Sequence, residues 1–187
     1  MELLVALGVE MGCIPDKSGA PHYYIIRNEE RIELTREQYN LWILAQQCRF
    51  TVEKAAKFLQ KSLQETEELC RELVEKQAII YWGKNLNEEF FQRYTLLPRG
   101  AAGERTKEDK QLLLSHPLAK PVEVSTAGHL IWMYANRLLT LNGIVHSITQ
   151  LTRLSEEDIR STFTYWVPYL IRHGLASLEI SLVEYGR

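Results

Sequence analysis

Cysteine is scarce in this chain of 187 residues: there are three, and no two of them form a Cys-x-x-Cys pair. The disulfide framework of a small secreted protein needs an even and larger set, so this class is disfavoured and a reducing compartment is expected. Five histidines are present, but none forms a His-Glu-x-x-His motif or pairs with a nearby cysteine at the spacing of a metal site. We therefore expect no metal and no other cofactor.

The sequence also lacks a long hydrophobic run and an excess of one charge. The longest clean apolar run near the start covers Leu3–Val9, whereas a helix that spans a bilayer needs about 20 apolar residues. The first 15 residues carry two glutamates and have no positively charged start, so they do not resemble a signal peptide. Twenty-two Lys and Arg nearly balance 24 Asp and Glu, which gives no overall attraction to nucleic acid or membrane. We expect a cytoplasmic protein without a membrane partner.

Motifs of the common enzyme classes are missing as well. There is no Gly-x-Ser-x-Gly elbow for a nucleophilic serine. The glycines at 100 and 103 superficially suggest a phosphate-binding loop, but Arg105 stands where that loop needs glycine followed by lysine. Adjacent carboxylates such as Glu67 and Glu68 do not face each other on a helix. We therefore expect a protein that is not an enzyme.

What the sequence does contain is an internal repeat. Residues 32–35 (Ile-Glu-Leu-Thr) match residues 122–125 (Val-Glu-Val-Ser), and the same offset of 90 aligns Trp42 with Trp132. Each stretch predicts a short strand, a Thr or Ser helix cap and a helix with a tryptophan on its apolar face. In the first copy a glutamine three residues after the threonine completes a capping box.

Two further landmarks extend the repeat. Ser62 and Ser155 each precede an acidic residue by three positions, and the apolar residues after them follow the i, i+3, i+4, i+7 spacing of a buried helix face. The ends of these helices, at residues 75–79 and 172–175, also resemble each other, with Gly174 in a C-cap role. Each copy therefore predicts a third helix that starts at a serine cap and ends at similar residues.

Between these landmarks the sequence predicts another amphipathic helix in each copy, although its alignment between the copies stays open. Its apolar residues lie within 52–59 and 144–151. Pro168 lies inside the third helix of the second copy, where it removes a hydrogen bond and should kink or split the helix.

The ends of the copies determine the predicted domains. Residues 79–82, a turn at 83–85 and apolar residues through Leu97 predict a β-hairpin. The second copy has no such turn, so its hairpin is either missing or completed by another segment. A glycine-rich stretch at 98–103 predicts a linker, with a short helix over 107–115 as an option. The predicted domains are 1–97 and 121–187, joined by a linker over 98–120.

The predicted order of elements resembles that of winged-helix proteins. It consists of a strand, three helices of which the last two form a helix-turn-helix, and a β-hairpin. The first unit is also similar to small peptide-chaperone domains of the PqqD type, with 23–26 and 31–34 as the opening hairpin and 51–53 starting the second helix. The resemblance implies a mainly α fold with small β-hairpins, in two winged-helix-like domains in tandem. It also implies two functions, since PqqD-type domains bind a peptide as an added strand and winged helices commonly regulate transcription on DNA.

The charge of the third helix favours the first of these functions. Residues 62–77 contain five glutamates against Arg71 and Lys76, and the second copy opens its helix with three consecutive acids. A helix that reads DNA presents basic or amide side chains to a surface with one negative charge per roughly 1.7 Å. Acids in the first turn of a helix also complement the helix dipole, and this structural explanation for their presence stays open. Our leading hypothesis is a non-catalytic regulatory protein that recognises a protein or peptide and is compatible with a homodimer.

The alternative is a DNA-binding transcription regulator that uses a basic second helix, the linker or the turn of the hairpin. Three lysines at i, i+3 and i+7 form that basic face, for which a solvated surface is the plainer explanation. Trp42, Trp132, Phe163 and Trp166 are expected in the core, whereas Tyr165 and the pair at 81–82 are candidates for an exposed contact. The candidate residues for contact with a partner or nucleic acid are Arg49, Lys54, Lys57, Lys61, Gln64, Tyr81, Trp82, Lys84, Arg99, Arg105 and Lys107.

Overall fold

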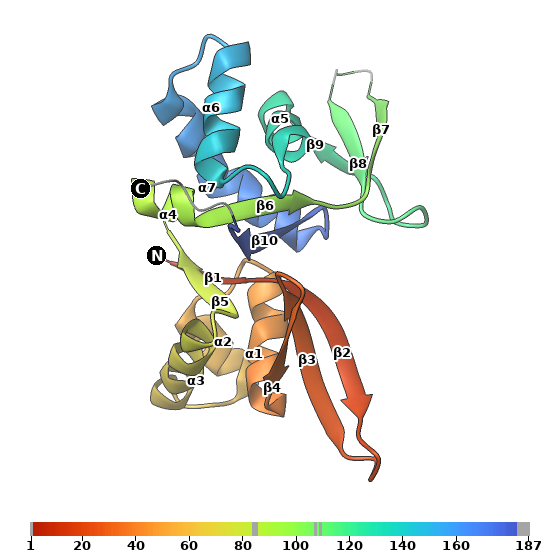
Figure 1. Ribbon diagram of the computed structural model, residues 1–187, viewed down its shortest axis with the longest axis vertical. Coiled ribbons are helices and arrows are strands. Elements are labelled where there is room, and N and C mark those ends of the chain that lie inside the picture. Colours follow the sequence, from red (N-terminus) through yellow and green to blue (C-terminus); the bar gives the residue numbers. More distant parts are fainter. Residues whose placement is uncertain (1, 84–85, 107, 109, 183–187) are drawn as a thin grey trace. The chain divides into compact units, whose positions relative to one another are not determined.

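A computed structural model describes residues 2–83, 86–106, 108 and 110–182, and the chain divides into two compact units, Met1–Lys84 and Asn85–Arg187 (Figure 1). The first unit contains β1 (Leu3–Ala6), β2 (Val9–Pro15), β3 (Pro21–Arg27), β4 (Glu30–Leu34), α1 (Arg36–Gln46), α2 (Val52–Leu59), α3 (Leu63–Glu75) and β5 (Ile79–Trp82). The second contains α4 (Glu88–Arg93), β6 (Tyr94–Pro98), β7 (Ala101–Arg105), β8 (Gln111–Leu114), β9 (Val122–Val124), α5 (Thr126–Tyr134), α6 (Leu141–Leu151), α7 (Glu156–Arg172) and β10 (Ala176–Ile180).

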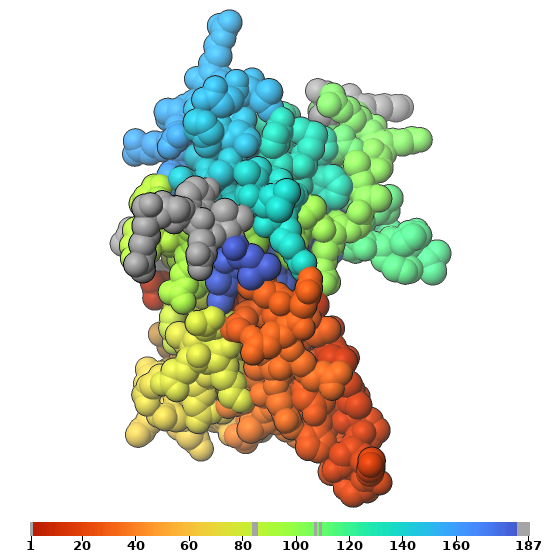
Figure 2. All heavy atoms as spheres, in the orientation of Figure 1, coloured from red at the N-terminus to blue at the C-terminus, as the bar shows by residue number. Residues whose placement is uncertain are grey.

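The prediction of a mainly α fold is wrong. The chain is 42% helical and 28% strand, and the strands form four small antiparallel sheets, so the fold is mixed α/β. Two strands of the second unit, β7 and β8, lie in the predicted linker, and β7 is so exposed and polar that its sequence has the composition of a loop. In Figure 2 the β2–β3 hairpin stands out from the body of the first unit.

Both units have the same order of elements and the same strand pairing. In each, a first strand pairs antiparallel with the last one, β1 with β5 and β6 with β10. A three-stranded antiparallel sheet and three helices lie between them in the chain, with sheet orders β2-β3-β4 and β7-β8-β9. The helix α4 precedes this common pattern in the second unit.

This pairing overturns the predicted hairpin. Residues 79–82 and 94–97 belong to different sheets, because β5 pairs with β1 and β6 pairs with β10. The second copy is thus completed by a segment that the sequence assigns to the first domain. The predicted linker also differs from the structure, since it contains β7 and β8, and residues 111–114 are strand where a short helix was an option.

Equivalent hydrogen bonds join the first strand of each unit to its helices. The indole nitrogen of Trp42 donates to the carbonyl oxygen of Leu7 at 3.1 Å, and that of Trp132 donates to the carbonyl oxygen of Arg99, also at 3.1 Å. The amides of Leu7 and Arg99 in turn donate to the carbonyl oxygens of Ala78 and Leu175, each at 2.8 Å, and each acceptor lies three residues past the end of the third helix of its unit. The two tryptophans therefore fix the backbone at equivalent positions, directly after the first strand of each unit.

The next position in each unit requires glycine. Gly8 and Gly100 follow the two residues just described and have φ of 80° and 77°. A Cβ atom on Gly8 would lie 2.4 Å from the carbonyl oxygen of Ile26, and one on Gly100 would lie 1.9 Å from that of Leu114. Both the left-handed backbone and the close approach of a neighbouring strand exclude a side chain here.

Helix caps follow the sequence closely. Reciprocal capping boxes start α1 at Thr35, α3 at Ser62 and α7 at Ser155, so these predictions are confirmed. Thr51 and Thr140 cap α2 and α6, which settles the alignment of the second helices that the sequence leaves open. A single helix, α7, continues through Pro168, so of the predicted kink or split the split does not occur.

Each unit has its own apolar core. Trp42 is fully buried in the first unit, with side chains from β1, α1, α3 and β5 around it. In the second unit the rings of Phe91 in α4 and Phe163 in α7 are both buried and lie 5.6 Å apart. Trp132 and Trp166, which we expected in the core, are only half-buried.

Candidate functional site

The candidate site is the outer edge of β4 together with a pocket beside it. β4 is an edge strand, because the sheet order is β2-β3-β4. The ammonium group of Lys76 donates to the carbonyl oxygen of Glu33 at 2.9 Å, so this oxygen points away from β3. Backbone groups of a strand alternate in direction, and those of Arg31 therefore point the same way as those of Glu33. The edge can accept another strand at these two residues.

Local sequence determines how this edge is presented. Asp16 closes the β2–β3 turn by accepting hydrogen bonds from the amides of Ser18 and Ala20 at 2.7 and 2.9 Å. Asn28 and Glu29 connect β3 to β4 with positive φ at both positions, the backbone of a two-residue hairpin turn. β4 then ends directly before Thr35, the cap of α1, and its residues Glu30, Arg31 and Glu33 are exposed.

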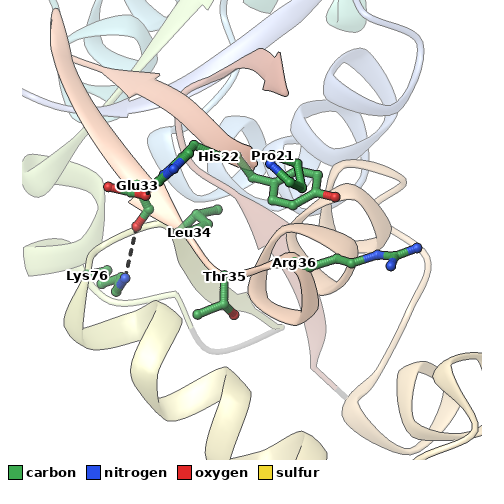
Figure 3. A pocket seen from close by; sticks show the side chains of 8 residues that line it. Pro21, His22, Glu33, Leu34, Thr35, Arg36 and Lys76 are labelled. Carbon is green, nitrogen blue, oxygen red and sulfur yellow. Dashed lines mark hydrogen bonds and ion pairs between the residues drawn. The ribbon is translucent and has the colours of Figure 1, made fainter. Parts of the chain in front are cut away.

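A pocket of about 520 Å³ opens at the end of β4 (Figure 3). Residues of β3, β4, the start of α1 and the position after the end of α3 line it. In Figure 3 the side chains of His22 and Glu33 approach each other, and a dashed line joins Lys76 to the backbone of Glu33. The lining residues are Pro21, His22, Tyr23, Glu33, Leu34, Thr35, Arg36 and Lys76.

The pocket has a cationic rim. Arg36 and Lys76 each contribute a positive charge, and the Nδ1 atom of His22 lies 2.5 Å from a carboxylate oxygen of Glu33. This hydrogen bond is the main reason that the pKa of His22 is raised, and Asp16, 3.5 Å from Nε2, adds to it. The pKa of Asp16 is lowered to about 2, chiefly by its hydrogen bond with the Ser18 hydroxyl. Both carboxylates favour the charged imidazolium. Because the Glu33 carboxylate offsets the charge of His22, the excess positive charge of the lining comes from Arg36 and Lys76.

Replacing Glu33 with glutamine should lower the pKa of His22 toward its ordinary value of 6.5. Because the pKa is raised in the folded chain, this contact contributes stability below pH 6.5 and loses it as the pH rises through the folded-state pKa. NMR titration of the imidazole measures the change. Glu37→Gln is the matched control, since Glu37 pairs with Lys61 rather than His22. An unchanged His22 pKa in Glu33→Gln would contradict the assigned cause.

Arg27 anchors the backbone of Lys76 by hydrogen bonds to its carbonyl oxygen and to that of the next residue. Its guanidinium donates to the carbonyl oxygens of Lys76 and Gln77 at 2.9 and 3.1 Å and forms an ion pair with Glu30 at 2.9 Å. The turn after α3 is thereby fixed to the β3–β4 turn. Lys76 thus projects from an anchored backbone although its own side chain is exposed.

The second unit has a reduced version of this site. Its edge strand β9 has three residues, and the carbonyl oxygen of Glu123 accepts a hydrogen bond from the hydroxyl of Tyr169 at 3.4 Å. Glu123 is the repeat partner of Glu33 at the offset of 90. The cavity at the start of α5 measures about 100 Å³ and is lined by Arg105, Gln111, Thr126 and His129.

Among the candidate contact residues that the structure describes, none lines the pocket of the first unit. Arg49, Lys54 and Lys57 are exposed at and before α2, so the basic face exists on the surface of that unit. Lys61 is half-buried and forms an ion pair with Glu37 at 2.7 Å. Gln64 is exposed in the first turn of α3, next to the acidic residues of that helix.

Of the aromatic pair at the end of the first unit, one member was misjudged. Trp82 is only 1% exposed, because its strand lies in the core and pairs with β1, whereas Tyr81 is 38% exposed. Tyr165 is 60% exposed, in agreement with its prediction. Arg99 and Arg105 are exposed in the second unit. Two further candidates, Lys84 and Lys107, lie outside the described residues.

Sequence reasoning missed the acidic and basic residues of the pocket, namely His22, Glu33, Arg36 and Lys76. They are distributed over four elements, and only the strand order brings them together. The one available signal was the resemblance that made 23–26 and 31–34 an opening hairpin, because a hairpin at the start of a small sheet leaves one of its strands at an edge.

Known proteins do not help to assign this site. No model of a known protein family, no curated protein and no solved structure matches the chain. Within the described part of the chain no three His, Cys, Asp or Glu side chains are grouped to hold a metal ion. Among the same residues, no helix has the length and apolar composition needed to cross a bilayer.

Proposed function

We propose that this chain is a non-catalytic binding protein that takes up an extended segment of a partner as an additional strand on the edge of β4. The observation that carries the proposal is the outward direction of the backbone groups of Arg31 and Glu33, next to an open pocket. Main-chain hydrogen bonds to such an edge supply affinity, and a pocket beside it supplies specificity through a side chain of the partner.

The charges of the first unit support this proposal over the insertion of α3 into DNA. Glu65, Glu67, Glu68 and Glu75 are all exposed on α3, and Arg71 is already paired with Glu68 at 2.8 Å. That surface repels phosphate, whereas the rim of the pocket carries Arg36 and Lys76. The two faces therefore favour an acidic or neutral peptide at the β4 edge.

The proposal predicts that Arg31→Pro abolishes peptide binding while the fold persists. Proline has no amide hydrogen, and its ring would occupy the space that the added strand needs. Proline is tolerated on edge strands where the amide faces outward, so we expect a loss of stability of only about 1–2 kcal/mol. Binding is measured by fluorescence anisotropy against a library of labelled extended peptides, and folding by circular dichroism.

Two controls make this test specific. Arg31→Ala removes the cation–π contact with Tyr24, 5.1 Å from the ring centroid, but keeps the amide, so it should retain binding. Ile32→Pro removes a hydrogen bond of the β3–β4 ladder and should unfold the sheet. Peptide binding that survives Arg31→Pro in the folded protein would refute strand addition at this edge.

The exposed lysines of α2 support DNA binding as the second candidate function. Lys54 and Lys57 lie one turn apart on an exposed face, and Arg49 precedes them. If this function holds, replacing Lys54, Lys57 and Lys61 together with alanine weakens binding to every duplex sequence alike. Tight duplex binding with this response, and no binding of extended peptides, would replace our proposal with the alternative.

A further inference from the structure

We infer that Lys76 is a displaceable cap on the β4 edge, which makes strand addition selective for peptides that carry an acidic side chain. This inference rests on the proposed function and specifies the kind of peptide that the site accepts. It concerns one contact, the hydrogen bond from the Lys76 ammonium to the carbonyl oxygen of Glu33 at 2.9 Å.

The contact occupies the position that an added strand needs. An incoming strand pairs with β4 by donating an amide to the outward carbonyl oxygen of Glu33. That oxygen already accepts from Lys76, so the ammonium has to move before the strand can dock fully. A lysine that covers an edge is a known way in which proteins discourage unspecific strand pairing.

The geometry allows Lys76 to move without disturbing the fold. Its side chain is exposed, and the backbone that carries it is anchored by Arg27 rather than by the ammonium. The acceptor that it leaves is a neutral carbonyl, and the amide of the peptide replaces the lost hydrogen bond. A carboxylate on the peptide offers the released ammonium a stronger, charge-assisted partner. Arg36, on the same rim, adds a second positive charge.

The second unit shows that capping of this carbonyl recurs. The equivalent oxygen, that of Glu123, accepts from the hydroxyl of Tyr169. The ring of Tyr169 is held between Trp166 and His173, with ring centroids 5.2 and 4.5 Å away. A packed aromatic ring on a three-residue strand is a fixed cap, whereas a flexible lysine on the five-residue β4 is a movable one.

The test uses the full chain and four synthetic peptides of alternating threonine and valine. Three differ only in the central residue, which is glutamate, glutamine or lysine, and the fourth is the glutamate peptide with alternate amides N-methylated. Affinities are measured by anisotropy at low salt for the wild type, Lys76→Met and Lys76→Arg. Methionine keeps most of the length of the side chain without its charge, and arginine restores the charge.

We expect the wild type to bind the glutamate peptide about fivefold more tightly than the glutamine peptide, and the lysine peptide least. Lys76→Met should lose this preference and bind the glutamine peptide more tightly than the wild type does, because the edge is no longer covered. Lys76→Arg should keep the preference for glutamate. A merely structural role of Lys76 would change all affinities alike.

The two proposals fail in distinguishable ways. Binding that is lost on N-methylation but has the same preference in the wild type and Lys76→Met refutes the cap and leaves strand addition intact. Failure of all peptides to bind, or equal binding of the N-methylated peptide, refutes strand addition and the cap with it.

Discussion

Gly100→Ala should destabilise the second unit by about 3 kcal/mol or more, the largest effect that we expect from the addition of a single methyl group. Two costs combine at this position. A non-glycine residue at φ of 77° costs about 1–2 kcal/mol by itself. The new Cβ would also lie 1.9 Å from the carbonyl oxygen of Leu114, so the backbone of one strand has to shift. Urea unfolding of the full chain measures the change.

Gly19→Ala separates these two costs. Gly19 has φ of 85°, but no atom beyond its two chain neighbours lies within 4 Å of where its Cβ would be, so only the backbone cost of about 1–2 kcal/mol applies. Gly8→Ala is the equivalent change in the first unit and should resemble Gly100→Ala. Equal destabilisation by Gly100→Ala and Gly19→Ala would show that the close approach of the strands contributes nothing.

Phe91→Ala should destabilise the second unit by about 3–5 kcal/mol, because it removes a fully buried ring from a packed core. Phe91 is 1% exposed, contacts Phe163 and lies under the guanidinium of Arg160, 4.8 Å from the ring centroid. The sequence assigns this residue to the first domain, so the change also tests the boundary between the units. Hydrogen exchange of the full chain should show lost protection in α7 and β10, with α1 and α3 unaffected.

Phe58→Ala is the matched control for that experiment. Phe58 is 64% exposed on α2, and the same truncation there should cost less than about 1 kcal/mol. If Phe91→Ala instead lowers protection in α1 and α3, residues 85–97 contribute to the first core and the division at Lys84 is wrong.

Local features of the fold could be predicted, because they depend on neighbours in the sequence. A side-chain oxygen at Thr35 or Ser62 and an acceptor three residues later are sufficient for a capping box, and both form. Helical spacing likewise identified the buried face of the third helix, where Cys70 and Leu73 are fully buried. These interactions span one turn and are largely independent of the rest of the chain.

Strand pairing could not be predicted in the same way. Residues 79–82 pair with 3–6, more than 70 positions away, although 94–97 are nearer and equally apolar. The sequence of a strand carries little information about its partner strand. Proximity therefore favours the nearest apolar segment, and the predicted hairpin is wrong. The strand β7, residues 101–105, shows the same limitation, since an exposed edge strand needs no apolar alternation to form.

The candidate site depends on tertiary structure rather than on local sequence. His22, Glu33 and Lys76 have unremarkable sequence neighbours, and their proximity arises from strand order and from the Arg27 anchor. The choice between peptide and DNA is a prediction that the binding experiments above test, whereas the winged-helix resemblance and the absence of catalysis stay predictions from the sequence.

By itself the sequence determined the caps, the buried helix faces and the repeated landmarks, because each is set by side chains within a turn or two of helix. Only the tertiary structure decided which strands pair, where the two units divide and which carbonyl oxygens face outward on β4. The physical reason is that backbone hydrogen bonds between strands are alike for every residue type, so partner and direction are selected by packing over the whole unit.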